Sequence, residues 1–133
     1  MGSTGLRLVF SNFPDGAIDC FERAMRLSPL DPLGYRFKAG IAFAHTVAKR
    51  YDEALDWVDQ VLQEQPRHTV MVRLKASLLG HLERMEEAEE WIQRTLELYP
   101  GLTVAYLERY LNPLIAATPL QLEGLRKAGL PNN

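Results

Sequence analysis

The chain has 133 residues, of which 47% are hydrophobic, enough apolar material for the core of one domain. Its 15 basic and 17 acidic residues are mixed along the chain and give a formal charge of -2, so no basic block is available to neutralise phosphates, and nucleic acid is excluded as an expected partner. Cys20 is the only cysteine, which excludes an intrachain disulfide and a thiolate zinc site and favours a reducing, cytoplasmic setting. The longest uncharged apolar run, Gly40 to Ala48, is about half of the roughly 20 residues that a membrane-spanning helix needs, so no membrane segment is expected.

The first predicted unit, residues 5–31, contains one amphipathic helix that ends before Pro29. Ala17 and Met25 lie on its apolar side. Cys20 lies among these positions, so we expect a buried thiol rather than a reactive one. The apolar residues 8–10 (Leu8, Val9 and Phe10) precede the helix and make self-association through exposed surface an alternative.

The second unit, residues 32–66, is predicted to form two helices. The first, roughly Pro32 to Ala48, is apolar and carries several small residues that let a partner helix approach closely. The second begins near Tyr51 and places Ala54, Leu55, Val58, Val61 and Leu62 at helical spacing with polar residues between them. Pro66 removes a backbone donor and ends this helix.

The third unit, residues 67–100, repeats the second. Four residues recur 34 positions later, namely Ala54, Trp57, Leu62 and Pro66 as Ala88, Trp91, Leu96 and Pro100. Such a period is typical of helix–turn–helix solenoids, in which each unit buries its apolar face only by stacking on its neighbours. The sequence therefore predicts a single all-α domain over residues 1–133, an α-solenoid of antiparallel helix pairs. Trp57 and Trp91 are expected to pack between units, with ligand stacking as the alternative.

The last segment, residues 101–131, departs from the pattern. Leu102 to Leu111 begins another first helix, but no fourth Ala-Trp-Pro skeleton follows. Instead Thr118 is expected to cap a helix with Pro119 at its first position and to be followed by leucines on one face. We predict that this helix ends at Gly129 and shields the last exposed face of the solenoid.

The spacing of Ala17, Phe21, Ala24 and Pro29 resembles the second helix of a tetratricopeptide repeat, and the later copies differ at the middle two places. This resemblance implies a right-handed superhelix that binds protein segments in its concave groove. It also places Gly5 at the family's glycine in the first helix, so the first repeat begins in mid-helix. We therefore expect the chain to be a fragment of a longer protein.

The closing GLRKAGLP, Gly124 to Pro131, and the SPLDP of Ser28 to Pro32 resemble segments of bacterial proteins in which such repeats follow a class III adenylate or guanylate cyclase domain or a winged-helix regulator. This second resemblance implies an alternative function, the C-terminal regulatory or sensor segment of such a protein. The catalytic domain would then lie outside this chain.

Catalytic and metal-binding patterns are absent from the sequence. His45, His68 and His81 have no second ligand at metal-binding spacing, and they are expected at the surface or in the groove. The acidic run Glu86 to Glu90 favours a solvated helix N-terminus, and no Gly-x-Ser-x-Gly elbow or glycine-rich phosphate loop occurs. We predict a protein without enzymatic activity, metal or cofactor.

The resemblance to tetratricopeptide repeats implies which residues line the groove. These are Arg36, Ala39, Phe43, Thr46, Val47, Val70, Arg73, Ser77, Gly80 and His81, continued by Val104, Leu107 and Leu111. An apolar floor with two arginines suits an extended or helical peptide that bears an acidic group or a C-terminal carboxylate. The alternative is that both arginines lie over the groove and bind nothing. The family's Lys and Asn set for clamping C-terminal carboxylates is absent, which disfavours a chaperone co-factor. The sequence predicts a protein-interaction module whose partner it does not name.

Overall fold

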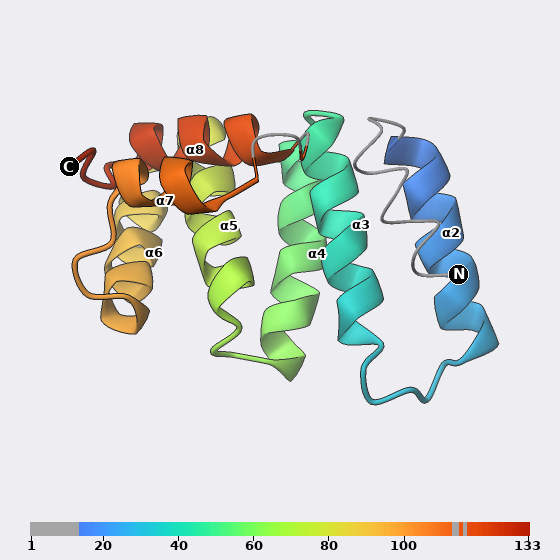
Figure 1. Ribbon diagram of the computed structural model, residues 1–133. Coiled ribbons are helices and arrows are strands. Elements are labelled where there is room, and N and C mark those ends of the chain that lie inside the picture. The colour runs from blue at the N-terminus through green and yellow to red at the C-terminus, as the bar shows by residue number, and fades with distance from the viewer. Residues whose placement is uncertain (1–13, 113–114, 116) are drawn as a thin grey trace.

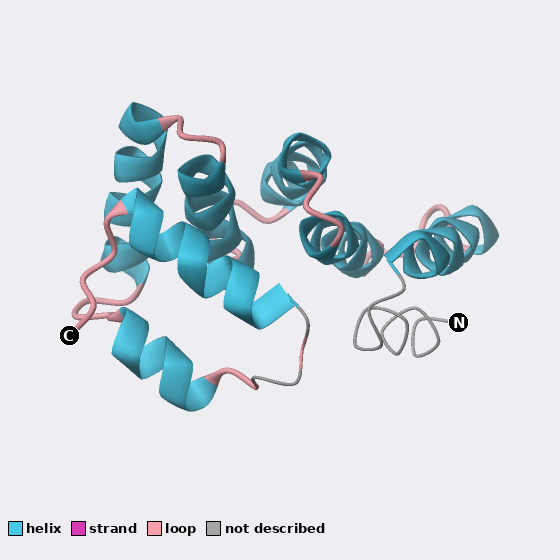
Figure 2. Ribbon diagram, turned by 90° about the horizontal axis from the view of Figure 1, so that it is seen from above, coloured by secondary structure: helices cyan, strands magenta, loops and turns pink. Residues whose placement is uncertain are grey.

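The computed structural model describes residues 14–112, 115 and 117–133, and these form seven helices and no strands. In chain order the helices are α2 (Pro14–Leu27), α3 (Tyr35–Val47), α4 (Tyr51–Glu64), α5 (Thr69–His81), α6 (Met85–Leu98), α7 (Val104–Tyr110) and α8 (Ala117–Ala128). Helices α2 to α6 stand side by side with alternating direction, and α8 crosses the row near one end (Figures 1 and 2). The fold is an all-α helical-repeat solenoid. The expectations for Gly5, Leu8, Val9 and Phe10 fall outside the described residues.

The two complete helix pairs, α3 with α4 and α5 with α6, turn in the same way. Lys49 and Glu83 both adopt a left-handed backbone, with φ of 61° and 59°. The next residue in each turn donates its N–H to a carbonyl in the preceding helix, Arg50 to His45 at 2.9 Å and Arg84 to Leu79 at 3.1 Å. The 34-residue period of the sequence is therefore also present in the backbone.

The recurring small residues lie between helices, as predicted. Ala17, Ala54 and Ala88 each have 0% exposed surface. The bulkier residues that share their helix face are also buried, namely Phe21, Ala24, Val58, Val61, Ile92 and Thr95. Because every unit places the same face against its neighbour, the apolar surfaces form two clusters, and Phe43 and Trp57 pack against both of them.

Both tryptophans are half-buried and pack against the apolar core. Trp57 lies against both apolar clusters of the core, one centred on α2 and α3 and the other on the rest of the solenoid, which confirms the packing interpretation for this residue. Cys20 differs from its prediction. It is half-buried rather than buried, because the face of α2 that meets α3 is formed by Ala17, Phe21 and Ala24, and Cys20 lies beside it.

The arrangement of the C-terminal segment differs from the one that the repeat pattern predicts. Helix α7 does not stack as another first helix but packs chiefly on α8, whereas α8 packs mainly on α5. The prediction that Thr118 caps α8 is wrong, because the helix begins at Ala117 and the Thr118 hydroxyl donates to the Asn112 carbonyl at 3.0 Å. The predicted end is confirmed, with Gly129 at φ 103°. Helix α8 lies against α5 and, to a smaller extent, α6, the last complete pair, and on α5 it covers the predicted groove residues Arg73, Ser77 and His81.

A candidate protein-interaction groove

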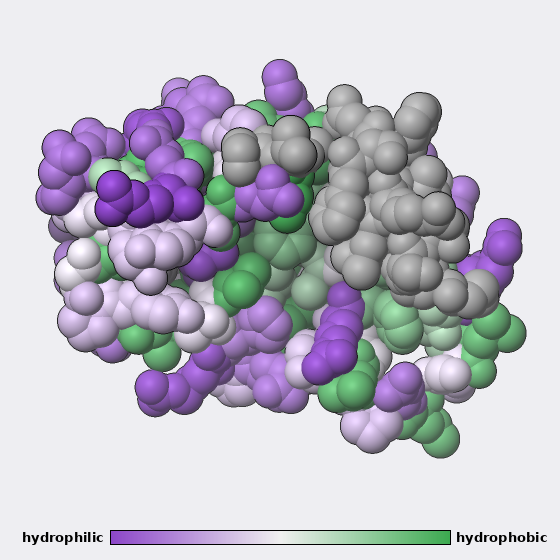
Figure 3. Space-filling model, in the orientation of Figure 1, coloured by the Kyte–Doolittle hydropathy of each residue, from purple (hydrophilic) through white to green (hydrophobic). Residues whose placement is uncertain are grey.

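The predicted groove residues lie mostly on the first helices of the pairs, α3 and α5, and we call the side of the solenoid that they occupy its inner face. Part of this face is open. Arg36 is exposed, and Ala39, Phe43 and Val70 are half-buried. We call these four residues the open half of the groove. Figure 3 shows apolar surface in a hollow near the middle of this face.

Two other predicted groove residues of α3 belong to the core. Thr46 has 0% and Val47 9% exposed surface. The Thr46 hydroxyl donates to the Ala42 carbonyl one turn earlier at 2.9 Å, so it is satisfied inside its own helix. These residues support the floor of the groove but offer little to a partner.

The α5 part of the predicted groove is covered by α8, and we call it the covered half. Arg73 Nε donates to Gln121 Oε1 at 2.7 Å, and Ser77 Oγ donates to the Gln121 carbonyl at 2.8 Å. His81 Nε2 lies 2.6 Å from the Leu120 carbonyl, and because a carbonyl only accepts, this nitrogen carries the proton. Leu107 of α7 is buried as well. Three predicted site residues thus contact the chain's own C-terminal helix.

The two helices cross at glycines. A Cβ at Gly80 would lie 3.0 Å from the Ala128 nitrogen and closer still to the Gly124 carbonyl oxygen. A Cβ at Gly124 would clash in turn with Ser77 and with the His81 ring. This contact therefore requires glycine in both helices, since any side chain would force the backbones apart.

His81 also ties the covered half to α4. Its ring stacks on Tyr51 with centroids 4.3 Å apart and planes 4° from parallel. Burial, and to a smaller extent the charge of Glu123, raises the pKa of Tyr51. Sequence reasoning missed Tyr51, Gln121 and Gly124 as members of this site. A polar Gln121 and a glycine within the predicted leucine-rich helix were signals that this helix meets polar groups and a close neighbour.

His45 is buried, which corrects its prediction, whereas His68 is half-buried at the start of α5. His45 has 8% exposed surface, and its Nδ1 accepts a hydrogen bond from Arg50 Nε at 3.0 Å. Burial and the Arg50 charge lower the pKa of His45. The same guanidinium bonds Asp15 at 2.7 Å, so the cluster joins α2, α3 and α4.

His68 has a structural role at the start of α5. Its Nδ1 accepts from the Met71 N–H at 3.3 Å and caps the helix. Burial lowers the pKa of His68. Only the neutral ring can accept through this nitrogen, so capping and the lowered pKa favour the same protonation state.

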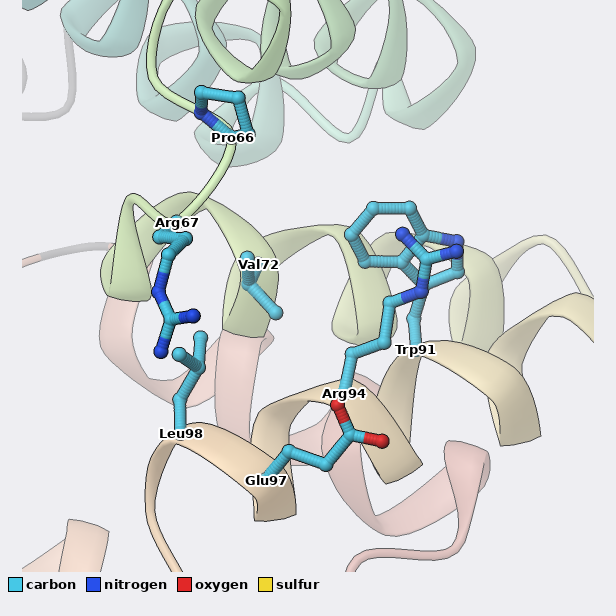
Figure 4. Close-up of a pocket in the computed structure, with 7 residues that line it drawn as sticks. All are labelled: Pro66, Arg67, Val72, Trp91, Arg94, Glu97 and Leu98. Atoms are coloured by element: carbon cyan, nitrogen blue, oxygen red, sulfur yellow. The ribbon is translucent and has the colours of Figure 1, made fainter.

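A cavity of about 440 Å³ lies away from the groove, between the α4–α5 turn and α6 (Figure 4). Its lining residues are Pro66, Arg67, Val72, Trp91, Arg94, Glu97 and Leu98. The Trp91 ring has Lys75 Nζ at 4.3 Å and the Arg94 guanidinium at 4.4 Å from its centroid. The ring therefore already has cationic neighbours from its own chain.

Within residues 14–112, 115 and 117–133, no three His, Cys, Asp or Glu side chains come together in a way that would hold a metal ion. None of the seven helices described there has the length and apolar character required to span a membrane.

Comparison with known proteins agrees with this geometry. A family model described as tetratricopeptide repeat matches residues 4–69. The matched segment, nearly half of the chain, is thus similar to tetratricopeptide repeats. The matched residues include α2, α3 and α4 and the turn at Lys49, where the backbone is left-handed.

Two curated relatives contain a segment similar to this chain. They are DnaJ protein P58IPK homolog A and DnaJ protein P58IPK homolog B of Oryza sativa subsp. japonica, each 36% identical over 69 residues. The aligned segment is 52% of this chain and 14% of either relative. The chain therefore spans a small part of the proteins that it matches. Tetratricopeptide repeats generally mediate contacts between proteins.

Proposed function

We propose that this chain is a non-catalytic protein-interaction module that binds a peptide or protein segment on its concave inner face. The observation that carries the proposal is the position of α8. A helix already lies across the inner face of α5 and makes hydrogen bonds with Arg73, Ser77 and His81, so this face has the shape and polar groups to hold a helix. The open half beside it presents an apolar floor and one exposed arginine.

We also propose that the tetratricopeptide arrangement continues beyond the matched residues as far as Pro100. Glu83 has nearly the same φ as Lys49, one period earlier, and Ala88 is as fully buried as Ala54. A right-handed superhelix is the shape that the resemblance implies for such a row. Three units would then contribute to a single inner face.

The open half favours an acidic segment. Among the described residues no carboxylate pairs with the Arg36 side chain, whereas nearby Lys38 bonds Glu64 at 2.8 Å. Arg73 does not add to this charge, because it lies beneath α8. One guanidinium beside the apolar Ala39 and Phe43 therefore suits a short segment with a carboxylate next to apolar residues.

Site-specific cross-linking tests the proposal. A photoreactive phenylalanine in place of Phe43 should capture a defined partner, and Arg36→Glu in the same chain should reduce the yield about tenfold or more, since it reverses the charge that attracts the segment. The matched control carries the same group at Gln60, which is exposed on α4. Equal capture from Gln60, or capture from Phe43 that ignores Arg36→Glu, would reject the groove.

The alternative is a regulatory segment of a cyclase or transcriptional regulator, which rests on the resemblance of Gly124 to Pro131. In the structure Gly124, Leu125, Ala128 and Leu130 are buried, so packing alone gives these residues a use. The natural reading frame upstream of Met1 tests this alternative. The two relatives are named DnaJ proteins, which suggests that this module belongs to a protein of that kind and not to a cyclase or regulator. The identity of the partner captured from Phe43 would distinguish these possibilities. A cytoplasmic location is the setting that the single Cys20 favours.

A further inference from the structure

Helix α8 is held on α5 by contacts that a helix from another protein would reproduce. Ser77 and His81 bond backbone carbonyl oxygens, which every helix offers whatever its sequence. Only the third bond, from Arg73 to the Gln121 amide oxygen, has a side-chain acceptor and therefore depends on the sequence of the bound helix. The polar part of the contact thus selects for an acceptor at one position of the bound helix.

The crossing adds a steric requirement. A Cβ placed at Gly80 would lie 3.1 Å from the Ala128 Cβ and too close to the Gly124 carbonyl oxygen. A Cβ placed at Gly124 would lie 2.6 Å from the His81 ring. A helix that occupies the covered half therefore needs glycine at the place of Gly124 and a small residue four positions later.

The charge of Arg73 is poorly matched by α8. Arg73 has 9% exposed surface, and within the described part of the chain it forms no ion pair with a carboxylate. A buried cation whose acceptor is a neutral amide keeps much of its desolvation cost. A carboxylate in the place of the Gln121 amide would add the attraction of an opposite charge and a second acceptor oxygen to the hydrogen bond that Arg73 already makes. The covered half is therefore better suited to a helix with glutamate than to α8.

We infer that α8 is a displaceable internal ligand, and that the covered half binds a partner helix with glutamate at the place of Gln121, glycine at that of Gly124 and a small residue at that of Ala128. This inference rests on the proposed function, because it names the partner segment for the same inner face. A tethered helix competes at an effective concentration of about 1 mM, so a free helix that is present below this concentration displaces α8 only when it binds more tightly. The glutamate supplies this advantage, about tenfold in affinity.

Peptide binding tests the inference. Labelled peptides of residues 117–130 are made with the native sequence, with Gln121→Glu, and with Gln121→Glu plus Gly124→Val. Their binding to two proteins is measured by fluorescence anisotropy: the full chain, and the full chain carrying Gly124→Val. In the variant the added side chain prevents α8 from packing on α5. The Gly124→Val chain should bind the glutamate peptide about tenfold more tightly than the native peptide, and should not bind the double variant. The unchanged chain should bind the glutamate peptide several-fold more weakly than the Gly124→Val chain does.

Two results would overturn the inference: equal affinities for the glutamate and native peptides, and no binding of any peptide to a folded Gly124→Val chain. If that variant does not fold, the full chain with Gln121→Glu provides the second measurement. Amide exchange in α8 should then slow about tenfold, with Gln121→Leu as the control that speeds it. Exchange that is unchanged or faster with Gln121→Glu would reject the inference.

These outcomes are separate from those of the proposed function. Failed cross-linking from Phe43 together with normal peptide binding would reject only the open half as an interaction surface. Normal cross-linking with equal peptide affinities would reject only the role assigned to α8.

Discussion

Replacing Gly80 by alanine should dislodge α8, although alanine is the better helix former. The added Cβ would lie 3.0 Å from the Ala128 nitrogen and closer still to the Gly124 carbonyl oxygen, both of which are backbone atoms. Backbone cannot rotate aside as the end of a side chain does. To restore a carbon–oxygen contact of about 3.3 Å, the helices must part by about 1 Å.

The size of the effect follows from that separation. The bonds from Ser77 and His81 to α8, now 2.8 Å and 2.6 Å long, would lengthen to about 3.6–3.8 Å and be lost. Two hydrogen bonds contribute about 1 kcal/mol each, and the disturbed packing costs about 1–3 kcal/mol. Alanine offsets about 1 kcal/mol through helix propensity. The net loss is about 2–4 kcal/mol, or roughly 6–20 °C in Tm for a chain of this size.

Thermal unfolding and amide exchange together check this reasoning. Exchange should speed up in α8 and the facing side of α5 while α2 and α3 stay protected. Gly40→Ala is the matched control, because the atoms nearest to its Cβ belong to the end of the Phe21 ring, and its effect should appear at α2 and α3 instead. A Tm that rises with Gly80→Ala would show that the helices are not in backbone contact and would refute the argument.

Three further predictions concern the solenoid itself. Burial lowers the pKa of His45 and His68, so the stability that their neutral forms give is fully present above about pH 6.5 and is lost as the pH falls below it. Urea unfolding at pH 7.5 and 5.5 should show this loss, and His45→Gln should make the loss smaller. Ala88→Leu should lower the free energy of unfolding by about 1–3 kcal/mol because it overpacks a buried position, whereas Ala105→Leu at an exposed position should change it by less than about 0.5 kcal/mol. Similar urea midpoints for the two variants would contradict the buried placement of Ala88. Glu83→Gly should stabilise the chain by up to about 1 kcal/mol because φ is 59° there, and a lower Tm would count against that backbone conformation.

The repeat and its core were predictable from the sequence because the forces that create them are periodic. Ala54 and Ala88 occupy the same place in successive units, and a unit that must stack on its neighbour buries that place each time. Proline at Pro66 and Pro100 ends a helix through its own ring, which needs no information from distant residues. Fold class, helix order and the buried stripe therefore follow from local chemistry and spacing.

The state of the groove was decided by the tertiary structure alone. The leucines of α8 would serve equally on the end of the solenoid or across its inner face, so their pattern does not select between the two. The choice depends on Gly124 meeting Gly80 and on Gln121 reaching Arg73, residues 44 and 48 positions apart in the chain. Such a match of small residues and hydrogen bonds has no period and no local signature. For this reason the sequence predicted the groove residues but did not predict that the chain's own last helix covers Arg73, Ser77 and His81.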